Sequence, residues 1–95
     1  MIILACETST SVVTVAVCRA QQGGGGASVA VLAESVVEAD RSHSERLLDT
    51  AQWLLHEARL SLDDVNLLAA GMGPGSLTGV RVGVAAWKGL AAARN

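Results

Sequence analysis

The chain has 95 residues, of which 51% are hydrophobic and 17% are charged, and its formal net charge is −2. This length and composition predict one modest ordered domain, or part of one. The basic residues are scattered, which argues against a module that binds nucleic acid by itself. No apolar run approaches the roughly 18 residues of a membrane span, which argues against a membrane protein.

Three strands are predicted in the amino-terminal part of the chain. Residues 2–6 and 12–18 are apolar runs separated by the polar stretch 7–11, and residues 28–37 are again rich in valine. Residues 21–26, with four consecutive glycines, are expected to form a flexible hairpin loop. Short links between successive strands favour an antiparallel meander.

The two cysteines are not expected to form a disulfide. If residues 12–18 fold back on residues 2–8, Cys6 lies near Val13 and Cys18 lies near the amino terminus, so the thiols do not face each other. The chain also has no basic segment of the kind that begins a signal peptide. We therefore expect reduced thiols and a cytoplasmic protein.

The first predicted helix spans residues 44–59. Ser42 and Glu45 have the spacing of a capping box. An apolar stripe about 120° wide follows at helical spacing, made of Leu47, Leu48, Ala51, Leu54, Leu55 and Ala58.

Trp53 is out of place for a core residue of this helix. Steps of about 100° per residue put it opposite the apolar stripe, beside Arg46, Thr50 and Glu57. It either lies flat on its own helix or belongs to a contact surface, and we favour the surface because tryptophan is enriched where proteins anchor each other.

The chain ends in a buried strand at residues 65–70 and a second helix at residues 79–94. One face of this helix carries larger residues, and the far face carries nearly only small ones. Arg81 and Lys88 form a narrow polar edge. A helix that is apolar nearly all round is buried on two sides, so the sequence implies a partner. The larger face comprises Val80, Val84, Trp87, Leu90 and Ala91, and the small face comprises Val82, Ala85, Ala86, Gly89, Ala92 and Ala93.

Residues 71–83, GMGPGSLTGVRVG, raise the question of a phosphate site. Gly79 is followed by Val80 and Arg81 instead of the Lys-Ser/Thr pair of a P-loop, and the glycine spacings also miss the dinucleotide fingerprint. Two interpretations stay open: an anion site at the helix amino terminus, or a hinge between strand and helix, which we favour.

No catalytic or metal-binding set is predicted. His43 and His56 have no second ligand at metal-binding spacing, and Ser76 lacks the surroundings of a nucleophile elbow because Pro74 precedes it by two residues.

The stretches IILACETSTSVVTVAV, RSHSERLL and AAGMGPGSLTGVRVGVAAWKGLA resemble, in order and spacing, the amino-terminal half of the TsaB family. This bacterial family takes part in tRNA threonylcarbamoyladenosine (t6A) biosynthesis and is also labelled glycoprotease-like or M22-like. The resemblance covers nearly all of the chain outside residues 23–26. It implies an α/β fold, the first lobe of an actin-like ATPase (ASKHA, ribonuclease H-like), with a mixed sheet and the order β-β-β-α-β-α read above.

The resemblance also implies a role. Residues 1–95 are expected to be a single lobe without the second lobe, acting as a non-catalytic partner that supports the transferase TsaD, with TsaE joining the complex and tRNA contacted only indirectly. The two helices would mediate a heterodimer with TsaD or a homodimer. The predicted interface residues are Arg46, Thr50, Trp53, Glu57, Val82, Ala85, Ala86, Gly89 and Ala93.

A nucleotide role is the main alternative, followed by a peptidase. Actin-like enzymes use an acidic residue of the first strand to help hold the nucleotide's metal, and this chain has Glu7 where the family usually has Asp. We expect no metal and no cofactor on this lobe alone, with ATP and Mg²⁺ bound weakly or only in the full complex. Weak phosphate-proximal candidates are Glu7, Thr8, Ser9, Thr10, Gly73 and Gly75.

Overall fold

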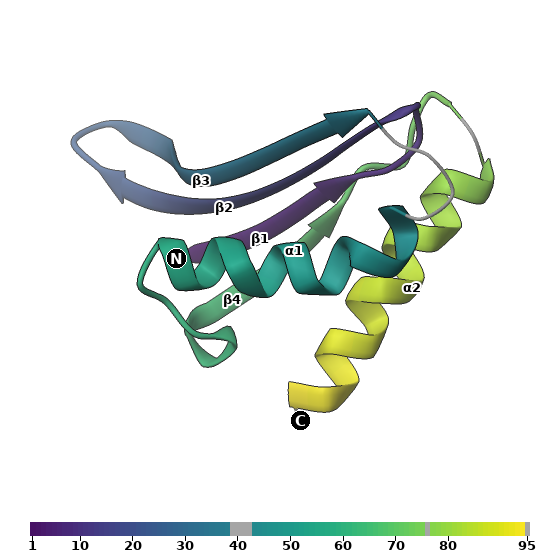
Figure 1. The fold of residues 1–95 in the computed structure, drawn as a ribbon. Helices are drawn as coiled ribbons and strands as arrows, with labels where there is room; N and C mark the ends of the chain where they lie inside the picture. Colours follow the sequence, from purple (N-terminus) through teal and green to yellow (C-terminus); the bar gives the residue numbers. More distant parts are fainter. Residues whose placement is uncertain (39–42, 76, 95) are drawn as a thin grey trace.

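The computed structural model describes residues 1–38, 43–75 and 77–94. Their order along the chain is three strands, a helix, a short 3₁₀ turn, a strand and a helix (Figure 1). The elements are β1 (Ile2–Glu7), β2 (Val12–Gly23), β3 (Gly26–Glu38), α1 (His43–Glu57), η1 (Leu62–Asp64), β4 (Val65–Ala70) and α2 (Leu77–Arg94).

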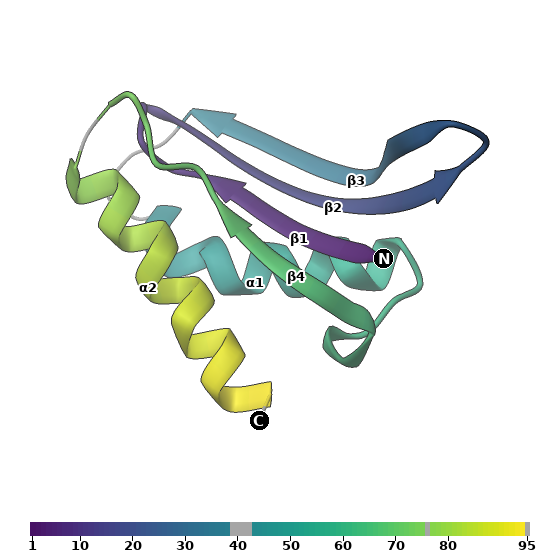
Figure 2. The same ribbon diagram turned by 180° about the vertical axis from the view of Figure 1, so that it is seen from behind.

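The four strands form one mixed sheet in the order β3-β2-β1-β4. β1 and β2, and β2 and β3, pair antiparallel, whereas β4 pairs parallel to β1. Both helices lie on the same face of this sheet, α1 against β2 and β3, and α2 against β4 and β1 (Figures 1 and 2). The predicted α/β class, element order and antiparallel meander are therefore confirmed.

The core lies between the sheet and the two helices. Alternate residues of β1 face the helices, and the middle of the apolar stripe of α1 packs on them because strand side chains alternate between faces while helical ones recur every three or four residues. Leu48 was predicted to belong to the stripe, but it lies at its edge and is 39% exposed. The buried cluster includes Ile2, Leu4, Cys6, Val15, Val17, Leu47, Ala51, Leu54, Leu55, Val65, Trp87 and Leu90.

The hairpin between β2 and β3 is confirmed, but its loop is shorter than predicted. Only Gly24 and Gly25 form the turn, with φ values of 57° and 102°, and the strands continue up to them on both sides. Glycine adopts these left-handed angles without steric cost, which permits a two-residue turn.

Cys6 lies opposite Val15 rather than near Val13, and Cys18 lies opposite Ile3. Both cysteines are free. The prediction that the two thiols do not face each other is confirmed, while the predicted register of Cys6 was two residues off.

The helix α1 ends in a Schellman motif, in which Arg59 N–H donates to the carbonyl of His56 (2.9 Å) and Leu60 N–H to that of Leu55 (2.8 Å). Arg59 takes the left-handed position with φ 60°, where glycine is usual. The predicted capping box at the other end involves Ser42, which lies outside the described residues.

Two side chains join β4 to its neighbours. Asn66 is an extra residue in β4 at an irregularity of its pairing with β1, and its Oδ1 accepts the N–H of Ile2 at 2.7 Å. The indole Nε1 of Trp87 donates to the carbonyl of Ala69 at 2.8 Å, which fixes α2 to β4.

Candidate functional site

The carboxyl ends of β1 and β4 meet at one edge of the sheet, where the polar turn after β1 lies against the glycine loop that leads into α2. Gly71 N–H donates to the carbonyl of Cys6 at 2.8 Å, which ties the loop to β1. In open α/β sheets the carboxyl ends of parallel strands are the usual place for a ligand. This junction, formed by residues 7–9 and 71–79, is therefore the first candidate site.

The glycines of the loop lie where another backbone or side chain comes too close for a side chain of their own. A Cβ on Gly71 would lie 1.5 Å from Oε2 of Glu7, one on Gly75 would lie 2.2 Å from the carbonyl oxygen of Ser9, and one on Gly79 would lie 2.0 Å from that of Thr8. The space that these glycines leave is filled by the turn after β1. This geometry favours the hinge interpretation over a phosphate cradle.

Hydrogen bonds hold the turn after β1 in shape and fasten it to α2. The backbone N–H and the hydroxyl of Ser9 both donate to Oε1 of Glu7, the former at 2.9 Å. The hydroxyl of Thr8 donates to the carbonyl of Gly79 in the first turn of α2. Thr8 and Ser9 are buried, so these contacts satisfy polar groups that have left water.

The junction holds Glu7 in its charged form. The Ser9 hydroxyl, and then the Ser9 backbone N–H, lower the pKa of the Glu7 carboxyl by hydrogen bonding to the carboxylate. Directly before it, burial together with the charge of Glu7 raises the pKa of Cys6 to about 11, so this thiol stays protonated. A phosphate approaching the loop would meet a carboxylate.

The structure brings Glu7, Thr8, Ser9 and Gly75 together, as the sequence predicted for a shared site. Thr10 is not part of it, because it is exposed and its hydroxyl exchanges hydrogen bonds with the backbone of Val12. Gly73, with φ 108°, shapes the loop. The spaced glycines after β4 mark positions where Glu7, Thr8 and Ser9 come close, so their spacing reflects one contact between the two segments.

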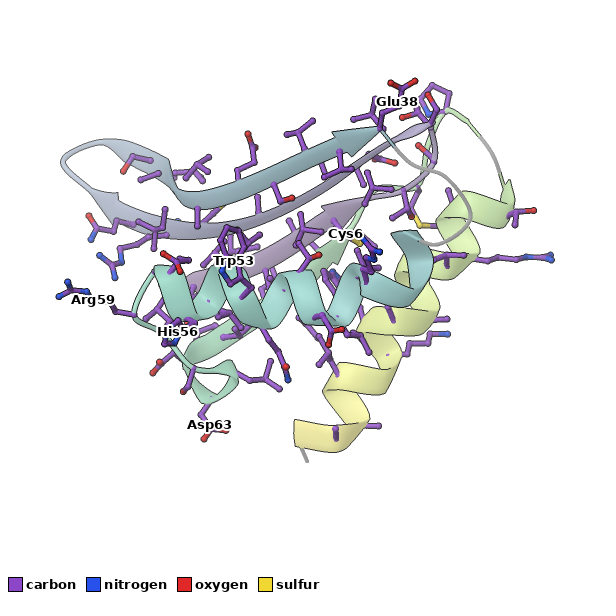
Figure 3. The ribbon with its side chains drawn as sticks, viewed as in Figure 1. Cys6, Glu38, Trp53, His56, Arg59 and Asp63 are labelled. Carbon is purple, nitrogen blue, oxygen red and sulfur yellow. The ribbon has the colours of Figure 1, made fainter. Side chains whose placement is uncertain are left out.

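The predicted interface of α1 and α2 divides into separate surfaces. Trp53 is 58% exposed, as predicted, and Figure 3 shows it projecting from α1 beneath the strands. Arg46 and Thr50 line a groove of about 130 Å³ between α1 and the strands β2 and β3. The α1 residues therefore lie on the side of the molecule that carries β3.

On α2 the small-residue face is partly turned inward, toward the hydrophobic core. Ala86, predicted to belong to the interface, packs against the hydrophobic core, and Val82 is half-buried. The exposed part of the face consists of Ala85, Gly89, Ala92 and Ala93.

Ala85 also borders a shallow apolar groove on the outer side of α2. The groove is also lined by Met72, Val80 and Val84, and by the cationic residues Arg81 and Lys88. Such a groove suits an apolar side chain that has a carboxylate nearby.

Within residues 1–38, 43–75 and 77–94, no three side chains of histidine, cysteine, aspartate or glutamate come close enough to hold a metal ion. Neither described helix has the length and apolar character required to cross a bilayer.

Comparison with known proteins identifies the family and the relatives that this chain resembles. The family model of TsaD, tRNA N6-adenosine threonylcarbamoyltransferase, matches residues 31–95. The tRNA threonylcarbamoyladenosine biosynthesis protein TsaB of Escherichia coli K12 is 49% identical over 51 residues, which are 54% of this chain and 22% of the relative. TsaB of Bacillus subtilis 168 is 33% identical over 91 residues, which are 96% of this chain and 36% of the relative.

Among solved structures, YeaZ from Pseudomonas aeruginosa superimposes with a TM-score of 0.74 at 35% identity. The match covers 98% of this chain and 39% of that protein. The chain therefore spans between about a fifth and two fifths of the length of these relatives.

Proposed function

The chain belongs to the TsaD family of tRNA threonylcarbamoyladenosine proteins, where its similarity is to TsaB, and we propose that it acts as a non-catalytic partner of a TsaD-type transferase in t6A biosynthesis. The helices α1 and α2 supply the contact. TsaE joins the larger complex, and tRNA is reached only through the transferase.

The observation that supports this role most is the uncovered face of α2. Ala85, Gly89, Ala92 and Ala93 are exposed, and small side chains let a second helix approach closely with little loss of side-chain entropy. The neighbouring groove adds apolar contacts, and Arg81 and Lys88 favour a partner with carboxylates.

The test uses the full-length protein and the TsaD homologue of the same organism, mixed and measured by light scattering after gel filtration. We expect a heterodimer whose dissociation constant rises at least tenfold in an Ala85→Glu variant with an unchanged circular dichroism spectrum. Ala91→Glu is the matched control, because Ala91 is also exposed on α2 but lines the groove beside β4. Failure of the wild-type pair to associate would refute the proposal.

Trp53→Ala tests the α1 surface separately. Because Trp53 and Ala85 lie on different helices, loss of binding in both variants means that the partner spans both. Loss in Ala85→Glu alone confines the partner to α2.

We also propose that this part of the chain binds no nucleotide or Mg²⁺ by itself, because the glycine loop is filled by the turn that carries Glu7. Isothermal titration of the full-length protein with ATP and Mg²⁺ should show no binding that depends on Glu7. Micromolar binding that is lost in Glu7→Gln would contradict this.

A further inference from the structure

The exposed residues of α2 include a row along one side of the helix. Thr78, Arg81, Ala85, Lys88 and Ala92 are all exposed, and they follow one another at intervals of three, four, three and four residues. At about 100° per residue these steps keep all five within an arc of about 80°. Alternating steps of three and four are the spacing at which one helix packs along another.

This row, which we call the α2 seam, alternates between cations and alanines after Thr78. Arg81 and Lys88 lie seven residues apart, and so do Ala85 and Ala92. Alanine lets a partner helix come close, and Ala85 shares one groove with the two cationic residues. The seam therefore has a small apolar contact point with a positive charge on either side of it along the helix.

The seam has no negative charge of its own. The helix α2 contains neither aspartate nor glutamate, and the residues that line the groove at Ala85 include no acidic side chain. Both cations are exposed, so a partner that covers them must replace the water that solvates them. An uncharged helix would leave two cations unpaired in the contact, which costs free energy.

We propose that the α2 seam binds a helix of another protein that carries two carboxylates seven residues apart, with small or apolar residues between them. The inference rests on the proposed function, since it names the chemistry of the helix that the TsaD-type partner supplies. Residues at this spacing lie about 10 Å apart on one face of a helix, which matches Arg81 and Lys88 when the two helices pack side by side. Opposite charges in this arrangement fix the register of the contact.

The same charges disfavour a second copy of this chain on the seam. Two seams packed together would bring Arg81 and Lys88 of each copy into one contact that holds no carboxylate from either α2. Like charges brought together across an interface cost free energy, and this repulsion is a usual source of specificity. The seam therefore favours an acidic helix over its own copy.

The test measures the binding of the full-length protein to the TsaD homologue of the same organism at low and high salt. Between about 50 and 500 mM NaCl the dissociation constant of the wild-type pair should rise about tenfold, because salt screens the attraction between cations and carboxylates. The double variant Arg81→Gln/Lys88→Gln should bind about tenfold more weakly at low salt and should lose this salt dependence. The double variant Arg81→Glu/Lys88→Glu should bind more weakly still.

Arg19→Glu/Arg59→Glu is the matched control for the charge reversal. Both arginines are exposed and lie outside α2, and Figure 3 shows Arg59 on the side of the molecule away from this helix. The two double reversals change the net charge by the same amount. The control should bind the homologue, and respond to salt, as the wild type does. A loss equal to that of Arg81→Glu/Lys88→Glu would mean that net charge acts instead of the seam, and the inference would be wrong.

The outcomes separate this inference from the proposed function. Failure of the wild-type pair to associate overturns both. Association that is unaffected by salt and by Arg81→Glu/Lys88→Glu leaves the proposed function standing and overturns the acidic helix. If a second copy occupied the seam, the chain alone would form a dimer that tightens as salt rises, because salt screens the repulsion between like charges. That result would also overturn the inference.

Discussion

Two glycine-rich segments of this chain, residues 23–26 and residues 71–79, contain glycine for different structural reasons. Around the tip of the β2–β3 ribbon, a Cβ added to any of the four glycines 23–26 would meet nothing within 4 Å. In the loop 71–79, a Cβ on Gly75 or Gly79 would collide with the backbone of the turn after β1. Glycine is therefore required for backbone conformation at Gly24 and Gly25 of the ribbon tip, and for close approach of two segments at the junction.

The largest expected effect comes from filling the junction. Gly79→Ala should reduce the free energy of unfolding by about 2–3 kcal/mol, because its Cβ would meet the carbonyl of Thr8 and force the turn away from α2. Urea unfolding followed by circular dichroism measures this. Gly89→Ala is the matched control on the same helix, where nothing lies within 4 Å, and it should raise stability by about 0.5–1 kcal/mol. Equal losses in both variants would contradict the comparison.

Arg59 occupies a left-handed backbone position in which glycine would be expected, whereas the segments above have glycine where it is needed. Arg59→Gly should raise the free energy of unfolding by about 0.5–1 kcal/mol, since glycine adopts a positive φ without a Cβ clash. Arg59→Ala removes the guanidinium but keeps the clash, so it should bring no gain. A similar increase in both variants would assign the effect to the charge instead.

The free energy of unfolding should also depend on pH through Glu7, by less than it changes in the preceding variants. Because hydrogen bonds lower the folded pKa of this carboxyl below its ordinary 4.5, its contribution to stability is present above about pH 4.5 and is lost as the pH falls through the folded pKa. The difference in unfolding free energy between the wild type and Glu7→Gln should therefore shrink from pH 7 to pH 3, as urea titrations at both values would record. Ser9→Ala should weaken the same dependence, and a difference independent of pH would exclude Glu7 as its source.

The smallest effect is expected at the ribbon. Gly23→Ala, where the backbone is extended and the space is open, should change the free energy of unfolding by less than about 0.5 kcal/mol. Thermal or urea unfolding of the Gly23→Ala and Gly79→Ala variants, measured under the same conditions, compares the two effects directly. A loss comparable with that of Gly79→Ala would show that the ribbon tip is packed after all.

Most elements were predictable because their signals are local. The stripe of α1 and the apolar run of β4 follow periodicities that depend only on neighbours in the chain. The exposed position of Trp53 follows from the same periodicity. Leu48 was misjudged, and the partial burial of Ala86 was not foreseen, because exposure at the edge of a stripe depends on how far the sheet and the other helix reach.

Only part of the candidate site at the junction could be predicted from the sequence. Sequence spacing ruled out the known phosphate fingerprints and grouped Glu7, Thr8 and Ser9 with the glycines. It could not show that these two segments fill each other's space, because they lie more than sixty residues apart in the chain and meet only when β4 pairs with β1.

The sequence by itself determined the fold class, the order of strands and helices and the resemblance to TsaB, since these depend on hydrophobic periodicity and on local motifs. Only the tertiary structure decided which faces are covered. Both helices settle on one side of the sheet, Ala86 turns inward while Ala85 stays exposed, and the outer edge of β3 carries no other described strand. Burial is a property of neighbours in space, and the junction glycines Gly71, Gly75 and Gly79 became necessary only when the fold brought atoms of residues 7–9 within 3 Å of the places where their Cβ atoms would lie.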